Sequence, residues 1–322
     1  MMSTRKESLR VLFAAPETAW HGILARLANE LPDCEFESTG NFEIPSLKGV
    51  DVLIPTMSRV DAGVIATSDQ LKLIQQVGVG LEGVDIAAAR SGGIQVANVP
   101  SADSGNADSV AELGLYLMLG LARNFRQLPR NLQNRAIGAP LGTTLQGKVA
   151  GVIGLGGLGK ALVSRLQALG MEVRGIKQSN PQQAASELGL SWAGTLEDID
   201  TLLGSSDYVI LTLPDTPDTH DLMNSRTFSM MKATGFLINL GRGGLVNREA
   251  LLQALESGKI AGAGLDVFWS EPPDPDDEIF QHNVMATPHV GGVTDLCQDG
   301  VIAAVTENLT RLSEGRELLH TQ

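Results

Sequence analysis

Cysteine is scarce in this chain of 322 residues, because Cys34 and Cys297 are its only two. Their spacing fits neither a metal site nor a disulfide framework, so the sequence predicts no metal and a reducing, cytoplasmic location. Long apolar runs are also lacking. No stretch approaches the ~18 apolar residues of a membrane-spanning helix, and the run over residues 11–15 is too short for the core of a signal peptide. We therefore expect no membrane partner.

Basic side chains are also in deficit. The chain has 24 Lys and Arg residues against 37 Asp and Glu residues, which gives a net charge of −13. That balance argues against nucleic acid and anionic membranes as partners, although it leaves room for one local basic pocket. Hydrophobic residues make up 43% of the chain, which is ample for buried cores. Since single domains usually hold about 100–200 residues, the length predicts two domains.

The most specific motif lies within residues 149–170. An apolar run, residues 149–153, is followed by glycines in the pattern G-x-G-x-x-G and then by leucines at helical spacing. A glycine-rich turn without a ligand has similar glycines, but a position between a strand and a helix favours a dinucleotide. There the glycines permit a tight turn, a close approach of pyrophosphate and close packing, next to a helix N-terminus. The expected contacts are Gly154, Gly156, Gly157, Leu158 and Gly159.

Short apolar runs alternate with helical spacing along the whole chain, which is typical of parallel α/β sheets. Residues 1–103 lack the glycine motif and form a small α/β domain, residues 104–290 form the dinucleotide-binding domain, and residues 291–322 return to the first. A helix over residues 109–123, capped by Asp108 or Ser109, makes the first crossing, and residues 192–203 are expected to be helical. The expected strands are 9–15, 50–54, 71–77, 94–99, 149–153, 171–176, 208–213, 236–240, 261–267 and 284–287.

Three polar residues each follow a predicted strand of the second domain: Arg242, Glu271 and His289. Each alone has an ordinary interpretation as an exposed or packed loop residue. Together they are more informative, because ligands of α/β sheets bind outside the carboxyl ends of the strands. The sequence therefore predicts that these three side chains share one crevice with the dinucleotide.

The three residue types suit hydride transfer to a keto acid. The reaction leaves an alkoxide that needs a proton, and an imidazole supplies one well because it titrates near neutral pH. A neighbouring carboxylate stabilises the imidazolium. A guanidinium offers a planar fork to a substrate carboxylate and can polarise the carbonyl. No G-x-S-x-G elbow for acyl transfer is present.

At these motifs the chain resembles the D-isomer-specific 2-hydroxyacid dehydrogenases, the family of glyoxylate, hydroxypyruvate, D-glycerate and D-3-phosphoglycerate dehydrogenases. The resemblance covers residues 70–300. It is carried by VGVGLEGVD (77–85), SVAELGLYLMLGLAR (109–123), GKVAGVIGLGGLGK (147–160), LTLPDTPDTHDLMN (211–224), INLGRGGLVNREAL (238–251), GAGLDVFWSEP (262–272) and TPHVGG (287–292).

The resemblance implies two Rossmann-like α/β domains: a doubly wound, parallel-sheet dinucleotide-binding domain inserted in a smaller flavodoxin-like substrate domain. It implies that Arg242, Glu271 and His289 are catalytic, and that Arg242 and the backbone N–H groups of Val79 and Gly80 hold the substrate carboxylate. Such enzymes are usually homodimers joined through the cofactor domains, with the active site between the two domains. Further cofactor contacts are expected at Leu213, Pro214, Thr219, Leu240, Gly241, Asp266 and His289.

One departure from the family pattern concerns the cofactor. An acidic residue usually ends the second strand of the dinucleotide unit and binds the ribose hydroxyls of NAD. Here Lys177 stands at that place, followed by Gln178 and Ser179. A lysine and a hydroxyl attract a 2′-phosphate, so NADP is the preferred cofactor. NAD remains an alternative, with Lys177 then an ordinary exposed lysine.

The expected reaction is the reduction of a small 2-keto acid to a 2-hydroxy acid. Residues 77–81 are small and apolar and add no basic group for a phosphorylated substrate, which favours glyoxylate or hydroxypyruvate. The segment Ser-Gly-Asn at 104–106 and the absence of Trp over residues 131–147 depart from the family pattern and leave the substrate open. The alternative is a non-enzymatic NAD(P)H-sensing scaffold of the same fold, which retains these motifs; the lack of a disordered tail weighs against it. Formate dehydrogenase is disfavoured, because that enzyme type has Gln in place of Glu271.

Overall fold

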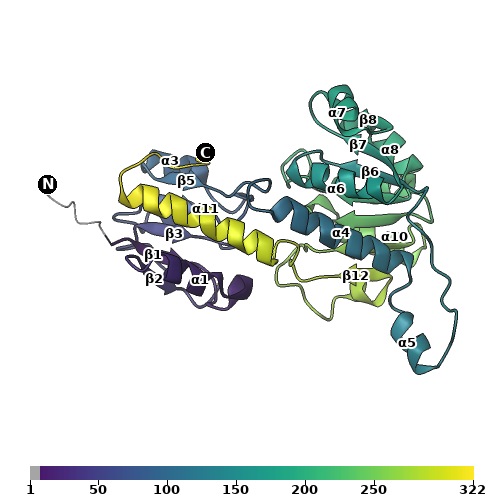
Figure 1. Ribbon diagram of the computed structural model, residues 1–322, viewed down its shortest axis with the longest axis horizontal. Helices are drawn as coiled ribbons and strands as arrows, with labels where there is room; N and C mark the ends of the chain where they lie inside the picture. Colours follow the sequence, from purple (N-terminus) through teal and green to yellow (C-terminus); the bar gives the residue numbers. More distant parts are fainter. Residues whose placement is uncertain (1–7) are drawn as a thin grey trace. The chain divides into compact units, whose positions relative to one another are not determined.

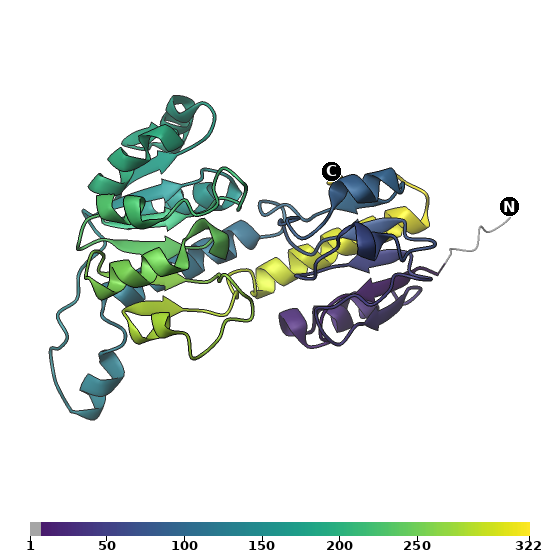
Figure 2. The same ribbon diagram turned by 180° about the vertical axis from the view of Figure 1, so that it is seen from behind.

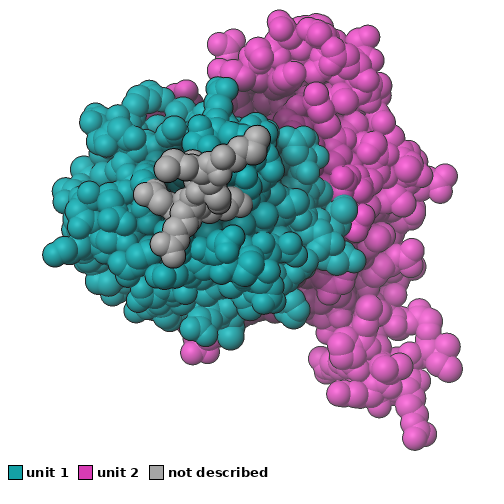
Figure 3. Space-filling model, turned by 60° about the vertical axis from the view of Figure 1, so that its left-hand side comes forward, with its two compact units in different colours: residues 1–106, 293–322 teal, residues 107–292 magenta. Residues whose placement is uncertain are grey.

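The computed structural model describes residues 8–322; the charged start of the chain falls in residues 1–7 and lies outside them. Two compact units make up the chain, coloured separately in Figure 3: residues 1–106 with 293–322, and residues 107–292. Each unit contains one parallel β-sheet with helices on both faces (Figure 1, Figure 2). No helix of the described residues is long and apolar enough to cross a bilayer.

The first unit is a small α/β sandwich. Its strands are β1 (Arg10–Phe13), β2 (Glu35–Ser38), β3 (Val52–Ile54), β4 (Leu73–Gln75) and β5 (Gln95–Ala97). Its helices are α1 (Ala19–Glu30), α2 (Ala62–Ile65), α3 (Ile86–Ser91) and α11 (Asp295–Ser313). The sheet order β2-β1-β3-β4-β5 is that of flavodoxin-like domains. Apolar residues of α1 and α11 cover one face, and those of α2 and α3 cover the other.

The second unit is larger and built on the same principle. Its strands are β6 (Val149–Ile153), β7 (Glu172–Ile176), β8 (Trp192–Gly194), β9 (Tyr208–Leu211), β10 (Phe236–Asn239), β11 (Gly262–Leu265) and β12 (Val284–Ala286). Its helices are α4 (Asn106–Ala122), α5 (Leu128–Gln133), α6 (Gly157–Ala168), α7 (Pro181–Leu188), α8 (Ile199–Ser205), α9 (Ser225–Met230) and α10 (Arg248–Glu256), with short 3₁₀ turns η1 (Leu196–Asp198), η2 (Gly243–Leu245) and η3 (Glu278–Gln281). Helices α4, α6 and α7 pack on one face, and α8, α9 and α10 on the other.

The order of the second sheet, β12-β11-β10-β9-β6-β7-β8, is that of doubly wound dinucleotide-binding sheets. The chain reverses direction across the sheet between β6 and β9, which are paired up to Ile153 and Leu211. Ligands of such sheets bind at this reversal, beyond the carboxyl ends of the strands. The predicted fold class, α/β with two parallel sheets, is confirmed.

Several local expectations were wrong. Residues 192–194 form strand β8 instead of a helix, because they pair with Arg174–Ile176 of β7; the helix follows only after a capping box made by Thr195 and Asp198. Helix α4 begins at Asn106, so Asp108 lies in the first turn of the helix rather than at its cap. In that position the Asp108 carboxylate forms an ion pair with Arg165 at 2.9 Å. The edge strand β2 was not foreseen, since its residues are at best half-buried.

Candidate active site

The glycine turn after β6 uses its three glycines for different purposes. Gly154 has φ +105°, a left-handed conformation that favours glycine. A Cβ on Gly159 would lie 2.0 Å from the carbonyl oxygen of Gly154, so this position has no room for a side chain. A Cβ on Gly156, in contrast, would meet nothing within 4 Å. The first and third glycines therefore shape the turn, whereas the second leaves open space that a ligand can enter.

The start of α6 borders that open space. Gly156 and Gly157 are exposed, and no side chain caps the helix. The first three N–H groups of a helix have no partner within it and carry a partial positive charge, which suits a pyrophosphate. On the other side, the Thr212 hydroxyl donates to the Gly154 carbonyl at 2.6 Å and ties the turn to the end of β9. These residues fit a dinucleotide, whose phosphates Gly156, Gly157 and Leu158 would hold.

The neighbouring strand β7 ends at the predicted adenosine site. Lys177 is half-buried, and its backbone N–H donates to the Gly194 carbonyl at 2.9 Å. Gln178 and Ser179 are exposed. The lysine backbone is thus fixed by the sheet, while the polar side chains that follow it are accessible.

The loops after β9 and β10, which carry several of the predicted cofactor contacts, pack against each other. A Cβ on Gly241, beside Leu240, would lie 2.6 Å from the Leu213 carbonyl oxygen, so the two loops pack backbone against backbone. Thr219 is buried, and its hydroxyl donates to the Pro214 carbonyl and accepts from the Thr216 N–H, both at 2.8 Å. Thr219 therefore shapes the loop around Pro214 from within.

Arg242, Glu271 and His289 lie at the ends of the three adjacent strands β10, β11 and β12. The Nδ1 atom of His289 is 2.6 Å from Oε2 of Glu271, and the other carboxylate oxygen accepts the Phe268 N–H at 2.9 Å. The Glu271 side chain is 14% exposed and that of His289 is 32% exposed. Because Nδ1 faces the carboxylate, Nε2 is the nitrogen that can exchange a proton with a substrate.

Arg242 is positioned by buried backbone contacts. Asn239, at the end of β10, is 1% exposed; its amide donates to the Arg242 carbonyl at 2.8 Å and its oxygen accepts the Gly241 N–H at 3.1 Å. A Cβ on Gly243 would lie 2.0 Å from the Phe268 carbonyl oxygen. The loop that carries Arg242 therefore touches the loop that carries Glu271, and the structure brings all three predicted catalytic residues to one edge of the sheet.

Asp266 anchors the loop that carries His289. It is 2% exposed; its Oδ1 accepts the Thr287 hydroxyl at 2.7 Å and the Val290 N–H at 2.9 Å, and its Oδ2 accepts the Gly291 N–H at 2.9 Å. Burial raises the pKa of Asp266, against these hydrogen bonds, which lower it. His289, in between, has φ +53°. The bonds on either side hold that left-handed turn, so Asp266 positions the histidine.

The Val79–Gly80 loop follows β4 in the first unit. Its carbonyl groups point inward: that of Gly78 accepts the Val99 N–H at 3.0 Å, that of Val79 accepts the Asn98 amide at 2.8 Å, and that of Gly80 accepts the Gln76 amide at 3.1 Å. The N–H groups of Val79 and Gly80 donate no hydrogen bond to residues 8–322. Successive N–H groups left without acceptors form a concavity suited to an anion such as a carboxylate.

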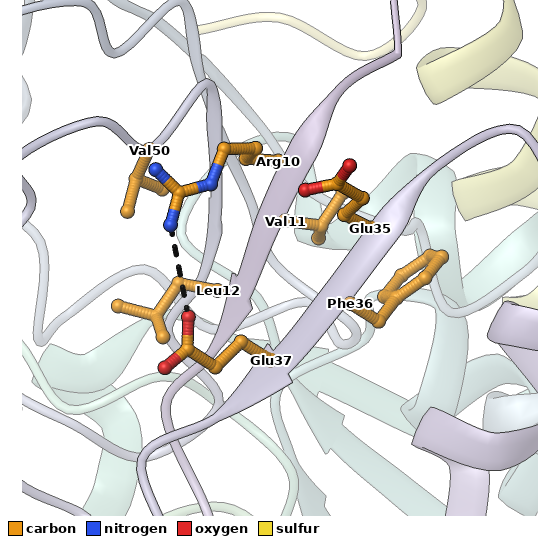
Figure 4. A pocket seen from close by; sticks show the side chains of 7 residues that line it. All are labelled: Arg10, Val11, Leu12, Glu35, Phe36, Glu37 and Val50. Atoms are coloured by element: carbon orange, nitrogen blue, oxygen red, sulfur yellow. Dashed lines mark ion pairs between the residues drawn. The ribbon is translucent and has the colours of Figure 1, made fainter.

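A pocket of about 290 Å³ lies elsewhere in the first unit, along β1 and β2 (Figure 4). Arg10 and Glu37 approach to 4.0 Å across it, and both side chains are largely exposed. The lining follows β1 from Arg10 to Leu12 and β2 from Glu35 to Glu37, with Val50 beside them. None of the predicted site residues lines it.

The sequence did not single out the residues that support the site: Asn239, Thr212, Thr287, Gln76 and Asn98. Four of them stand within a few residues of a predicted contact, which was the available signal, whereas Asn98 lies far along the chain from the Val79–Gly80 loop that it contacts. Among residues 8–322, no group of three or more His, Cys, Asp or Glu side chains is arranged to hold a metal ion.

Comparison with known proteins adds the family. The sequence-family model described as "D-isomer specific 2-hydroxyacid dehydrogenase, NAD binding domain" matches residues 115–291 of this chain. The D-3-phosphoglycerate dehydrogenase of Methanocaldococcus jannaschii is 36% identical over 275 residues, which make up 84% of this chain and 51% of that protein. The chain thus spans about half the length of the phosphoglycerate dehydrogenases that it matches.

Two further relatives are similar in length to this chain. The glyoxylate reductase of Thermococcus litoralis is 32% identical over 283 residues, which cover 84% of this chain and 83% of that protein. The crystal structure of the NADPH-dependent glyoxylate/hydroxypyruvate reductase of Sinorhizobium meliloti, in complex with NADP and malonate, superimposes with a TM-score of 0.84 at 27% identity. The superposition covers 98% of this chain and 96% of the Sinorhizobium meliloti chain.

The open space at Gly156 generates a prediction. Gly156→Ala should leave the melting temperature unchanged, because its Cβ meets nothing, yet weaken NADPH binding about ten-fold or more by filling the phosphate cradle. Gly159→Ala is the matched control: it should destabilise the protein by about 1–3 kcal/mol through overpacking. Thermal unfolding and NADPH fluorescence titration measure both effects. Unimpaired NADPH binding by Gly156→Ala would contradict the use of this turn.

Proposed function

The chain belongs to the D-isomer specific 2-hydroxyacid dehydrogenases, and from this membership we propose that it transfers a hydride between NADP(H) and a small 2-keto or D-2-hydroxy acid. The observation that carries the proposal is the 2.6 Å contact between His289 and Glu271, at the carboxyl edge of the sheet that holds the glycine turn. A proton donor and a dinucleotide site on one sheet edge are what such a reaction requires.

Gly156, Gly157 and Leu158 would hold the phosphates of a nicotinamide dinucleotide, which in its reduced form would supply the hydride. The N–H groups of Val79 and Gly80 and the guanidinium of Arg242 bind the substrate carboxylate, and Arg242 also polarises the keto group. As the keto oxygen gains negative charge, Nε2 of His289 delivers a proton to it. Glu271 orients the imidazole through Nδ1 and stabilises its protonated form. In the reverse direction the same histidine accepts the proton from the hydroxy acid.

Glyoxylate or hydroxypyruvate is the proposed substrate. The segment at residues 77–81 is small and apolar and offers no basic side chain to a phosphate. Two relatives of similar length are named for glyoxylate or hydroxypyruvate reduction, which supports the same choice. A cytoplasmic location also stays a prediction, based on the low cysteine content.

NADP is the proposed cofactor, and NAD is the alternative. Lys177 stands immediately after β7 with a fixed backbone, and exposed Ser179 follows it. A lysine and a hydroxyl at this position can pair with a 2′-phosphate, whereas a carboxylate would repel it. The similar Sinorhizobium meliloti structure is described as NADPH-dependent, in agreement with this choice.

The proposed assembly is a homodimer that covers an arm of the second unit, residues 123–147 around α5. Leu132 is 82% exposed, Ile137 is 99% exposed and Leu141 is 92% exposed. Figure 1 shows α5 standing away from the sheet of its own unit. Exposed apolar side chains gathered on one segment mark an interaction surface, and a second copy is the partner that the family resemblance implies.

Replacing the proton donor tests the mechanism. His289→Ala should lower kcat for glyoxylate reduction by about 100- to 10,000-fold, the usual contribution of a general acid. Glu271→Gln should cause a smaller loss, because it keeps a hydrogen-bonding group without the charge. NADPH binding should be retained in both. His282→Ala, another histidine of the second unit, is the control. Near-normal turnover by His289→Ala would reject the proton-donor assignment.

Charge reversal at Lys177 tests the cofactor. Lys177→Asp should lower the ratio of kcat/KM for NADPH to that for NADH by about ten-fold or more, as expected for the loss of a charge-assisted hydrogen bond. Lys148→Asp makes the same charge change just before β6, at the amino ends of the strands, whereas Lys177 follows the carboxyl end of β7. Lys148→Asp should therefore leave the ratio of kcat/KM for NADPH to that for NADH at the wild-type value. An unchanged ratio in Lys177→Asp would remove the phosphate contact from the account.

Sedimentation tests the dimer. Ile137→Asp should convert a dimer into a monomer at micromolar concentration, because it places a charge in an apolar interface. Leu169→Asp alters a partly exposed leucine outside the arm and should keep the wild-type mass. A monomeric wild-type protein, or an Ile137→Asp protein that stays dimeric, would exclude this arm as the interface.

A further inference from the structure

We propose that Asn98 and Asn308 are positioning residues for the substrate carboxylate, because their side-chain amides, with residues 318–322, hold the Val79–Gly80 loop with its N–H groups outward. The inference rests on the proposed function, in which those N–H groups bind the substrate. All of the residues concerned belong to the first unit.

Asn98 holds the loop directly. Its side-chain amide donates to the Val79 carbonyl at 2.8 Å, and the next residue, Val99, donates its backbone N–H to the Gly78 carbonyl at 3.0 Å. A peptide carbonyl and the N–H of the following residue belong to the same rigid plane and point in opposite directions. Fixing the Gly78 and Val79 carbonyls inward therefore turns the N–H groups of Val79 and Gly80 outward.

Asn308 acts through a chain of buried amides. It is 2% exposed on α11, and its amide donates to Oε1 of Gln75 at 2.7 Å. Gln75, fully buried, donates in turn to the Gln76 carbonyl at 3.0 Å. The Gln76 side chain accepts the Val77 N–H at 2.9 Å and donates to the Gly80 carbonyl at 3.1 Å. Buried amides are costly when a partner is lost, so each link constrains the next.

Residues 318–322 complete the arrangement. Asn308 binds Leu319 twice, accepting its N–H at 2.9 Å and donating to its carbonyl at 3.0 Å. Beyond Leu319, this segment runs antiparallel to β5: the Asn98 N–H donates to the His320 carbonyl at 3.3 Å, and the Gln322 N–H donates to the Val96 carbonyl at 2.9 Å. Figure 1 shows these last residues, in yellow, beside β5. The segment thus supports Asn98 from the side opposite the loop.

This arrangement predicts a particular kinetic signature. The carboxylate does not react, so the loop binds the ground state and the transition state alike, and loosening it changes KM rather than kcat. Asn98→Ala should raise KM for glyoxylate about three- to ten-fold, the equivalent of one hydrogen bond. Asn308→Ala should act in the same direction. Both should keep the wild-type kcat and NADPH affinity.

The experiment measures steady-state kinetics with glyoxylate and calorimetric binding of oxamate, a carboxylate analogue that is not reduced, in the presence of NADPH. Thr67→Ala is the matched control. It also removes side-chain–backbone hydrogen bonds in the first unit, those of the Thr67 hydroxyl with Leu47 and Val64, but none of these residues is hydrogen-bonded to the Val79–Gly80 loop. Asn98 is half-buried, so Asn98→Ala keeps the test valid if Asn308→Ala fails to fold.

Weaker oxamate binding and a raised KM in Asn98→Ala, with Thr67→Ala as wild type, would support the inference. Unchanged KM and oxamate affinity in Asn98→Ala, in a wild type that turns over glyoxylate, would overturn it and leave the proposed function intact. A fall in kcat with KM unchanged would also overturn it. If the wild type reduces neither glyoxylate nor hydroxypyruvate and does not bind oxamate, the carboxylate-binding loop and the proposed function both fail.

Discussion

Close backbone packing at the carboxyl edge of the seven-stranded sheet is the constraint on which the site depends. Glycine makes it possible at three places: Gly159 against Gly154, Gly241 against Leu213, and Gly243 against Phe268. At each, a Cβ would come within 2.6 Å of a carbonyl oxygen, which real side chains do not do. The first contact shapes the phosphate turn, and the other two draw the loops after β9, β10 and β11 together. The three proposed catalytic side chains share one edge because these backbones touch.

Buried polar groups then orient what the packing has gathered. Asn239 fixes the loop of Arg242, Asp266 fixes the loop of His289, and the Phe268 N–H fixes Glu271. None of these groups needs to change during the proposed reaction, so the arrangement is preorganised, which is how enzymes stabilise developing charge at low cost. The first unit uses the same device with neutral amides at the Val79–Gly80 loop.

The sequence predicted the fold class and the main strands because buried parallel strands are continuous apolar runs, and because the glycine motif has a strict local context. It did not predict β2 or β8, whose residues are mostly exposed or half-buried and which exist because a neighbouring strand pairs with them. That Arg242, Glu271 and His289 lie at one edge of the sheet could be predicted from strand ends alone. Their supports could not, since a pairing such as Asn308 with Gln75 joins residues far apart in the chain and leaves no periodic signal.

The central claim is that this chain is a hydride-transfer enzyme acting on small 2-keto acids. The most direct measurement is the consumption of NADPH and of NADH by the purified protein with glyoxylate, hydroxypyruvate, pyruvate or phenylpyruvate. We expect turnover with glyoxylate or hydroxypyruvate that is faster with NADPH than with NADH. Tight NADPH binding without turnover of any of these acids would contradict it and indicate a nucleotide-sensing scaffold instead.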